Sequence, residues 1–445
     1  MMNKAFVIAA CTMVFIALPI FAKGQAEPTQ GASTAAAGAP SGDITVAWWG
    51  AGTRNQKTQA VIDLFEKAYP NVKVTGVALG WDQYWQKLTV EATSHTIPCV
   101  AQDQSRQMLT YTNQGVFAPL DDLISQGKID VSKIGAGVLK TGQGTDGKMY
   151  MIPYGAAYFG FMYNKTMVDN AGLPALPEVY TWQQFSNWLQ QAKAKLPAGV
   201  YPLMQNGYNS DPFVGYLSSL GYSLFDKSGQ LGFPESALKD YWSIWLNYAK
   251  EGITMPIQLA VQEQTTSMEQ SNLVQGKVMV ETAPGNQLPG AQTAASQIKT
   301  GDMAMMMYPT GGGKDIGGVL ATNGFSIPTS CTGGKLDASA AFINFFTNDP
   351  AAAKAFASDN GVVTNTDLLA QQINNPSTAP AVKQYLQLFE VISKHNPPLV
   401  LFTPGFTAVF STLYPQVFQQ VAFGKMTLDQ GVQSFFAQAK QQLAR

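Results

Sequence analysis

Hydrophobic positions recur at two different spacings along the chain, and the two spacings alternate. Residues 44–49 (ITVAWW) form a short apolar run that ends on two tryptophans, which is typical of a strand. Residues 58–69 place apolar side chains at helical spacing and stop at Pro70, so they predict a helix. Residues 72–77 (VKVTGV) alternate and predict a second strand.

The same alternation of strands and helices continues through most of the chain. Further helices are predicted at 84–92, 106–115, 182–195, 232–250, 337–347 and 350–358, and further strands at 99–101, 146–155, 159–165, 277–281 and 319–327. The strands 146–155 and 159–165 are expected to be joined by a turn, and residues 379–445 are mostly helical in pattern. This order predicts an α/β architecture with largely parallel sheets and right-handed crossovers.

The N-terminal end, residues 1–22, has the pattern of a secretory signal peptide. A basic residue precedes an apolar stretch over residues 5–22, which is borderline in length for a membrane anchor and is interrupted by Pro19. Small residues follow, so we expect cleavage near Ala22 or Ala26.

One feature within the signal and one after it bear on where the protein resides. Residues 8–11 (IAAC) resemble a lipoprotein box that would acylate Cys11, but most of the apolar run follows this cysteine, so lipidation is the less favoured alternative. Residues 23–42 are small, polar and proline-containing, which predicts a flexible leader. We therefore expect an exported protein, either periplasmic or at the cell surface.

Composition narrows the class of protein. With 445 residues the chain is long enough for two large domains. Its net charge of −1 and pI of about 6.2 lack the basic excess that nucleic-acid binding requires. The 8 tryptophans and 17 tyrosines suit either a larger core or a site for flat, partly apolar ligands.

Cysteine and histidine are scarce after the leader. Only Cys99 and Cys331 remain, and His95 and His395 lie 300 positions apart. These residues provide little material for a zinc site or a nucleophile–histidine pair, so we expect no catalytic residues, no metal and no cofactor. One disulfide in an oxidising compartment and two separate thiols are both compatible with the sequence.

Several segments occur together in the order found in one protein family. They are TQAVIDLFEKAYPNVKV, TYTNQGVFAPLDDLI, DGKMYMIPYGAAYFGFMYNKTMVDNAGLP followed by TWQQFSNWLQQAKAKL, LVQGKVMVETAPGN, and AAFINFFTNDPAAAKAF. In these segments the chain resembles the extracellular sugar-binding proteins of ABC importers, solute-binding protein family 1, which are similar to maltose-binding protein. One departure is TIPCV, which has Cys99 where the family commonly has Asp.

The resemblance implies a two-lobed α/β fold of the type II periplasmic-binding-protein class, with a hinge and a central ligand cleft. Residues 43–154 plus 318–365 would form the N-terminal lobe, and residues 155–317 plus 366–445 the C-terminal lobe. The lobes would close on a carbohydrate by hinge bending and deliver it to the permease subunits of an ABC transporter in the membrane. We expect a monomer that is not an enzyme.

A sugar has apolar C–H faces and a rim of hydroxyls, so its site needs aromatic plates and hydrogen-bonding side chains. Such side chains either follow predicted strands, whose carboxyl ends carry the ligand sites of α/β sheets, or occupy positions where the resemblance implies ligand contact. The candidate ligand-binding residues are Trp48, Trp49, Trp81, Asp103, Gln104, Arg106, Tyr154, Tyr158, Asn209, Asp211, Glu281, Asn286 and Phe406. For each, the alternative is packing in a core or hinge, or a solvated loop or turn.

The adjacent tryptophans raise a specific question. Neighbours in a strand point to opposite faces, so one core cannot contain both Trp48 and Trp49. We expect Trp49, which is nearer the Gly-Ala-Gly turn, to face the cleft and stack on the solute, and Trp48 to anchor the strand. Packing of both indoles in cores is the alternative.

Other functions stay open on the sequence alone. A secreted glycosidase would need two carboxylates across the cleft, and carriers of iron or polyamines would need tyrosine, histidine or several carboxylates. Arg54 and Arg106 also leave room for an acidic or phosphorylated sugar. The glycine-rich segment 310–318 is not a phosphate loop, because Asp315 follows Lys314, so we interpret it as a hinge or cleft loop.

Overall fold

The computed structural model describes residues 40–445 apart from 51, 227, 264–266, 312–318, 396–401, 403–404 and 444–445. Pro40–Arg445 forms one compact unit. The predicted signal peptide, Cys11, residues 23–39 of the leader and most of the glycine-rich segment lie outside the described residues. None of the helices within that range has the length and apolar character needed to cross a membrane.

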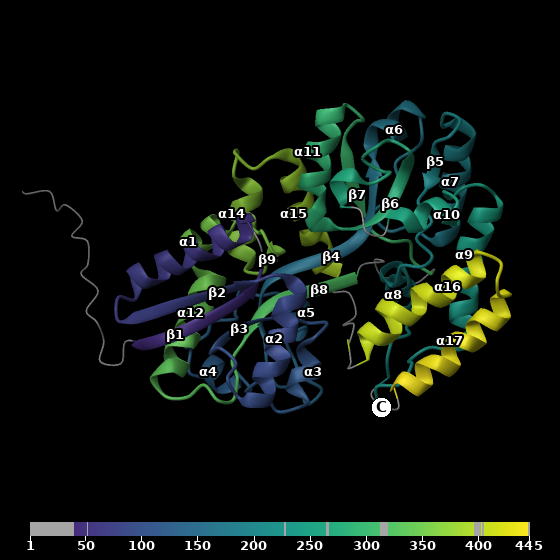
Figure 1. Cartoon of the computed structure of the whole chain (residues 1–445). Coiled ribbons are helices and arrows are strands. Elements are labelled where there is room, and N and C mark those ends of the chain that lie inside the picture. Colours follow the sequence, from purple (N-terminus) through teal and green to yellow (C-terminus); the bar gives the residue numbers. More distant parts are fainter. Residues whose placement is uncertain are drawn as a thin grey trace, which may run out of the picture. The chain divides into compact units, whose positions relative to one another are not determined.

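The N-terminal half begins with strands β1 (Gly42–Trp49), β2 (Val72–Leu79) and β3 (Val100–Gln104), which pair in parallel as predicted. Helix α1 (Gly52–Ala68) connects β1 to β2, and α2 (Trp81–Ser94) connects β2 to β3. Buried side chains of α1 and α2 belong to two different hydrophobic clusters, so the helices cover opposite faces of the sheet (Figure 1).

The sheet of the described residues is mixed rather than largely parallel. Its strands run in the order β2-β1-β3-β8-β4-β6-β5, and β7 and β9 also pair with β4. The bounds are β8 Val319–Ser326, β4 Ile152–Asn164, β6 Val278–Pro284, β5 Tyr201–Leu203, β7 Met303–Met306 and β9 Val362–Val363. β8 runs antiparallel to β3, and β4 is antiparallel to β6, β7, β8 and β9. The prediction of parallel pairing was wrong here because the order of elements does not reveal the direction in which a returning strand enters a sheet.

Strand β4 is one continuous strand where the sequence predicted two strands and a turn. Its first half pairs with β8 and β9, and its second half with β6 and β7 (Figure 1). Gly155 and Gly160 do not turn the chain. They allow close approach instead, since a Cβ at either position would lie 2.5 Å from a backbone oxygen, of Asn360 and Met306 respectively.

The remaining helices cover the sheet and build the C-terminal part. Their bounds are α3 Met108–Thr112, α4 Asp121–Ser125, α5 Ala136–Lys140, α6 Lys165–Asn170, α7 Trp182–Lys195, α8 Ser210–Ser219, α9 Glu235–Lys250, α10 Ile257–Ala260, α11 Leu288–Ile298, α12 Gly334–Asn348, α13 Pro350–Phe356, α14 Thr366–Asn374, α15 Pro380–His395, α16 Tyr414–Ala422 and α17 Leu428–Leu443. Short 3₁₀ helices lie at η1 Val261–Glu263, η2 Met268–Gln270 and η3 Gly285–Gln287, and a π-helix lies at η4 Thr407–Leu413. Helix α7 has the predicted bounds, since Thr181 and Gln184 form a capping box at its start. The aromatic stripe of α9 is buried, which confirms its interpretation as core.

The two tryptophans of β1 point to opposite faces, as strand geometry requires. Trp48 belongs to the larger hydrophobic cluster and its Nε1 donates to Asn55 Oδ1 at 3.0 Å. Trp49 packs against Trp81 and Trp85, with ring centroids 5.2 and 5.3 Å away. Both indoles are 4% exposed, whereas Trp81 is 44% exposed. Packing is the role that the structure shows for both tryptophans, and stacking of Trp49 on a solute stays a prediction.

Cys99 and Cys331 form a disulfide across 232 sequence positions, with their Cα atoms 5.3 Å apart. Cys99 directly precedes β3 and Cys331 follows β8, and these strands are hydrogen-bonded neighbours. The cysteine that departs from the family pattern is therefore half of a covalent link beside the β3–β8 ladder.

Removing this disulfide should destabilise the fold. A Cys99→Ser, Cys331→Ser variant should lose about 2–5 kcal/mol of unfolding free energy, because the unfolded chain regains the entropy of a long closed loop. Urea unfolding with and without reductant measures the loss. Reductant should lower the midpoint of the parent protein and leave the variant unchanged, and equal midpoints in all four samples would contradict the expectation.

Truncation of either buried indole should also act through stability. Trp48→Ala and Trp49→Ala should each lose about 3–5 kcal/mol, because each leaves a large void in a packed cluster. Trp81→Ala is the matched control and should lose about 1 kcal/mol or less. Unfolding curves give these values. Unchanged stability of Trp49→Ala together with lost solute binding would restore the stacking role of Trp49.

Candidate functional site

A polar cavity of about 390 Å³ gathers five of the candidate ligand residues. They are Arg106, Asn209, Asp211, Glu281 and Phe406. The rest of the lining comprises Asn206, Tyr208, Ser210, Glu263, Thr282, Phe410, Ser411 and Pro415. Segments that are far apart in the sequence therefore meet here: the end of β3, the start of α8, strand β6 and the region of η4 and α16.

The loop before α8 is shaped by its own side chains. Asn209 is the N-cap of α8, and its side chain accepts a hydrogen bond from the Asp211 backbone N–H at 2.8 Å. The Asx turn that was the alternative to ligand binding is therefore present, and the same residues also line the cavity. The cap fixes Asp211 in the first turn of the helix, where a carboxylate is favoured by the helix dipole.

Arg106 is held by one carboxylate and three aromatic rings. Its Nη2 pairs with Asp211 Oδ1 at 2.8 Å. Its guanidinium carbon lies 4.6, 5.1 and 5.6 Å from the ring centroids of Phe159, Phe402 and Phe406. The buried Nε of Arg106 has no hydrogen-bond partner, so one donor in the cavity wall is unsatisfied. Phe406 thus packs on a guanidinium as well as lining the cavity.

Glu281 supplies an unsatisfied acceptor to the same cavity. Its side chain is buried, and its Oε2 has no hydrogen-bond partner. Burial raises the pKa of Glu281 well above its usual range, the nearby Glu263 raises it further, and hydrogen bonds from Leu273 and Ser271 offset the shift only in part. Burial therefore disfavours the charged form of Glu281 in the empty cavity.

Glu263 is the second carboxylate of this acidic side of the cavity. It accepts hydrogen bonds from both the backbone N–H and the side-chain amide of Asn272, and burial raises its pKa. Tyr208 lies near both carboxylates, and its hydroxyl donates to the Ala260 carbonyl at 3.3 Å. Neither Glu263 nor Tyr208 was predicted as a ligand residue from the sequence. Tyr208 was within reach, since it sits between Asn206 and Asn209, but Glu263 follows no strand and carries no local signal.

Asp103 and Gln104 do not line the cavity. Asp103 is fully buried, and its carboxylate accepts from Ser326 Oγ at 3.0 Å and from the Gln104 backbone N–H at 2.7 Å. The Gln104 side-chain amide donates to Asn323 Oδ1 at 3.0 Å. Both side chains therefore form hydrogen bonds that link β3 to β8, just before Arg106 in the sequence.

The two candidate tyrosines of β4 are buried with satisfied hydroxyls. Tyr154 accepts hydrogen bonds from Gln102 and from Asn360, the latter at 3.0 Å, and Tyr158 donates to the Tyr385 carbonyl at 3.1 Å. Asn286 is exposed in η3 and lies outside the cavity. These three, like the tryptophans of β1 and Trp81, are not brought to the cavity in this structure.

The two arginines that left room for an anionic solute both have acidic partners. Arg54 Nε lies 3.0 Å from Asp359, which also pairs with Lys57 at 3.0 Å. Arg106 is paired with Asp211. Arg106 therefore offers no uncompensated positive charge to an anionic solute in the cavity, and Arg54 is paired with Asp359 outside the cavity.

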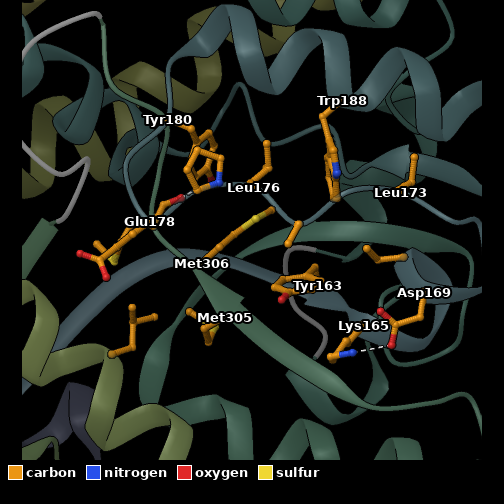
Figure 2. A pocket seen from close by; sticks show the side chains of 15 residues that line it. Tyr163, Lys165, Asp169, Leu173, Leu176, Glu178, Tyr180, Trp188, Met305 and Met306 are labelled. Atoms are coloured by element: carbon orange, nitrogen blue, oxygen red, sulfur yellow. Dashed lines mark hydrogen bonds and ion pairs between the residues drawn. The ribbon is translucent and has the colours of Figure 1, made fainter.

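A second cavity of about 280 Å³ is mainly apolar and contains none of the candidate residues. Tyr163, Met306 and Trp188 point into it, while Lys165 and Asp169 pair with each other at one edge (Figure 2). None of its lining residues has a buried polar atom without a partner among the described residues. The described lining of this cavity therefore lacks the unsatisfied polar atoms that would favour recognition of a polar solute.

The chain is similar in sequence to a family of bacterial binding proteins and to individual binding proteins. The profile of a family described as bacterial extracellular solute-binding protein matches residues 60–386. A binding protein of Brucella abortus is 26% identical over 257 residues, 56% of this chain and 59% of that protein. The diacetylchitobiose binding protein DasA of Streptomyces coelicolor is 28% identical over 226 residues, 51% of each chain. The chain thus spans just over half the length of these curated relatives.

Solved structures agree with this picture. The extracellular solute-binding protein family 1 structure from Alicyclobacillus acidocaldarius superposes with a TM-score of 0.76 at 26% identity, covering 91% of this chain and 99% of that one. The predicted two-lobed α/β class of periplasmic solute-binding proteins is therefore confirmed.

The buried Asp103 should make stability depend on pH. Burial raises its pKa to about 7, above the usual value of 3.8 that it regains on unfolding. The folded chain therefore binds this proton more tightly, and the stabilisation is complete below about pH 4 and lost as the pH rises through about 7. Between about pH 5 and about pH 8 the loss should be about 2–3 kcal/mol.

Asp103→Asn should flatten this dependence, because the amide oxygen still accepts from the Gln104 N–H and the Ser326 hydroxyl can rotate to accept from the amide. Urea unfolding of both proteins across this pH range measures the difference. Parallel stability curves for the parent and the variant would contradict the assignment.

Proposed function

Because the chain belongs to the bacterial extracellular solute-binding proteins, we propose that it is the substrate-binding component of an ABC importer. It captures a mono- or oligosaccharide outside the cytoplasm and delivers it to the permease subunits in the membrane. The solute binds in the cavity between Arg106, Asp211 and Glu281. The name of the Streptomyces relative, a diacetylchitobiose binding protein, supports a carbohydrate.

One observation carries this proposal. Two residues that line this cavity each have a buried side-chain atom without a hydrogen-bond partner, the donor Arg106 Nε and the acceptor Glu281 Oε2. Each such group destabilises the empty site by about 1–3 kcal/mol. A sugar hydroxyl can donate and accept at once, so a polyol can satisfy both groups, while Phe406 and Phe410 offer apolar contact to its C–H faces.

The proposed lobes are residues 43–154 plus 318–365 and residues 155–317 plus 366–445. Strand β4 passes from one lobe to the other, and the Arg106–Asp211 ion pair then joins them across the cavity. Hinge bending around β4 would open and close the site. The chain acts as a monomer after export by its signal peptide, and the Cys99–Cys331 disulfide suits an oxidising compartment.

A thermal-shift screen of mono- and oligosaccharides on the exported protein tests the solute class. A sugar at about 100 times its Kd should add about 2.7 kcal/mol of apparent stability. The same screen includes divalent metals, iron, polyamines and sugar phosphates. A shift with one of these and with no neutral or amino sugar would overturn the carbohydrate assignment.

Recovery of the bound sugar separates a receptor from a glycosidase. Mass spectrometry after long incubation should find the sugar unchanged. Release of new reducing ends, at a rate that follows protein concentration, would instead support the glycosidase alternative.

Replacing Arg106 should weaken binding of the sugar found in the screen. Arg106→Ala removes the unsatisfied donor and frees Asp211, so we expect the Kd to rise about 10- to 100-fold in titration calorimetry. Arg54→Ala breaks an ion pair outside the cavity and is the matched control, with an unchanged Kd. Equal affinities of Arg106→Ala and the parent protein, in samples with intact unfolding transitions, would remove Arg106 from the site.

A further inference from the structure

The charges around the binding cavity do not balance. Its lining contains one basic residue, Arg106, and three acidic residues, Asp211, Glu263 and Glu281. Arg106 and Asp211 neutralise each other in their ion pair. Glu263 and Glu281 are left with no basic partner in the wall of the cavity.

Glu281 is the focus of this imbalance. Its side chain is 8% exposed, it projects from the buried strand β6, and its Oε2 has no hydrogen-bond partner. A buried carboxyl oxygen without a donor is a strongly unfavourable arrangement unless a ligand completes it. The cavity beside it has room for that ligand.

Glu263 is fixed in place but not neutralised. Its two oxygens accept from the backbone N–H and the side-chain amide of Asn272, and both donors are uncharged. Lys277 is the basic group that acts on Glu263, and its effect is the smallest of those that shift this carboxyl. The hydrogen bonds therefore orient Glu263 while leaving its negative charge available to a solute.

We propose that the solute carries a protonated amino group, as an amino sugar does, and that this ammonium binds between Glu281 and Glu263. The inference rests on the proposed carbohydrate function and specifies the sugar class. An ammonium has a full positive charge and three N–H donors, so it can pair with more than one carboxyl group of this wall. A hydroxyl has one donor and no charge, and an anionic sugar would be repelled.

Binding of such a cation should release a proton. Burial and the neighbouring Glu263 raise the pKa of Glu281 in the empty cavity, and a bound ammonium would lower this pKa again. The reaction is R–NH₃⁺ plus Glu281–COOH giving the ammonium–carboxylate pair plus H⁺, which leaves to the buffer. The other titratable or charged groups that face this pair are Glu263, Asp211, Arg106 and Tyr208, with Lys277 beyond Glu263.

The test compares two sugars that differ only in the amino group. Glucosamine oligosaccharides and N-acetylglucosamine oligosaccharides of equal length are titrated into the exported protein at about pH 6.5, where the amine is charged. Two buffers with different ionisation enthalpies report proton release. The amino form should bind about 10- to 100-fold more tightly and release protons on binding, and the acetylated form should release none.

Variants assign the effect to the carboxyls. Glu281→Gln should abolish the preference for the amino form and the proton release, and Glu263→Gln should reduce the preference. Glu269→Gln removes an exposed carboxylate outside the cavity and should behave like the parent protein. If Glu281→Gln does not fold, the Glu263→Gln variant and the proton release of the parent protein decide the question.

The outcomes separate this inference from the proposed function. Equal binding of both oligosaccharides without proton release overturns the inference and leaves the carbohydrate function standing. Binding of spermidine, included as a third titrant, with no binding of either sugar overturns the carbohydrate function and supports the cation site. Binding of none of the three, with no difference in Glu281→Gln, overturns the cation site.

Discussion

The arrangement of the sheet and of the binding cavity depends on close backbone packing around β4. Gly155 and Gly160 have no side chain, so neighbouring backbone oxygens can approach them closely. A Cβ at either position would collide with these oxygens. A single strand can therefore serve β8 and β9 along one half and β6 and β7 along the other. Glu281 on β6 and Arg106 after β3 owe their common cavity to this shared strand.

The cavity buries charged side chains, which is unfavourable in a protein interior. An arginine is taken largely out of water and is compensated by one carboxylate and three aromatic faces. A glutamate beside it is left incomplete. Proteins retain such unfavourable arrangements mainly where function requires them, which is why the polar cavity, rather than the better enclosed apolar one, supports recognition of a solute.

The sequence predicted those features that neighbouring residues encode, and it did not predict features that depend on distant segments. Helix α7 was predictable to the residue because Thr181 and Gln184 carry the start signal themselves. Four of the five cavity residues were found because polar side chains follow strands, and Phe406 was found as a possible aromatic plate in the helical C-terminal part. Glu263 reaches the site through tertiary packing alone, and no local sequence pattern predicts it. Asp103 and Tyr154 have side chains suited to ligand binding. Their hydrogen-bond partners Ser326 and Asn360 come from distant segments, so only the fold shows that Asp103 and Tyr154 are already hydrogen-bonded within the protein.

The merging of two expected strands into β4 has the same origin, since the neighbours that hold it extended are remote in sequence.

The disulfide also changes what a cut in the chain would mean. Cys99 and Cys331 enclose all of β4, α8 and β6 in one covalent ring. A single proteolytic cleavage anywhere between the two cysteines would leave both fragments attached to each other through sulfur. The solute site would thus keep its segments at high effective concentration after such damage, and a cut between Arg106 and Glu281 would separate them only if the disulfide were also reduced.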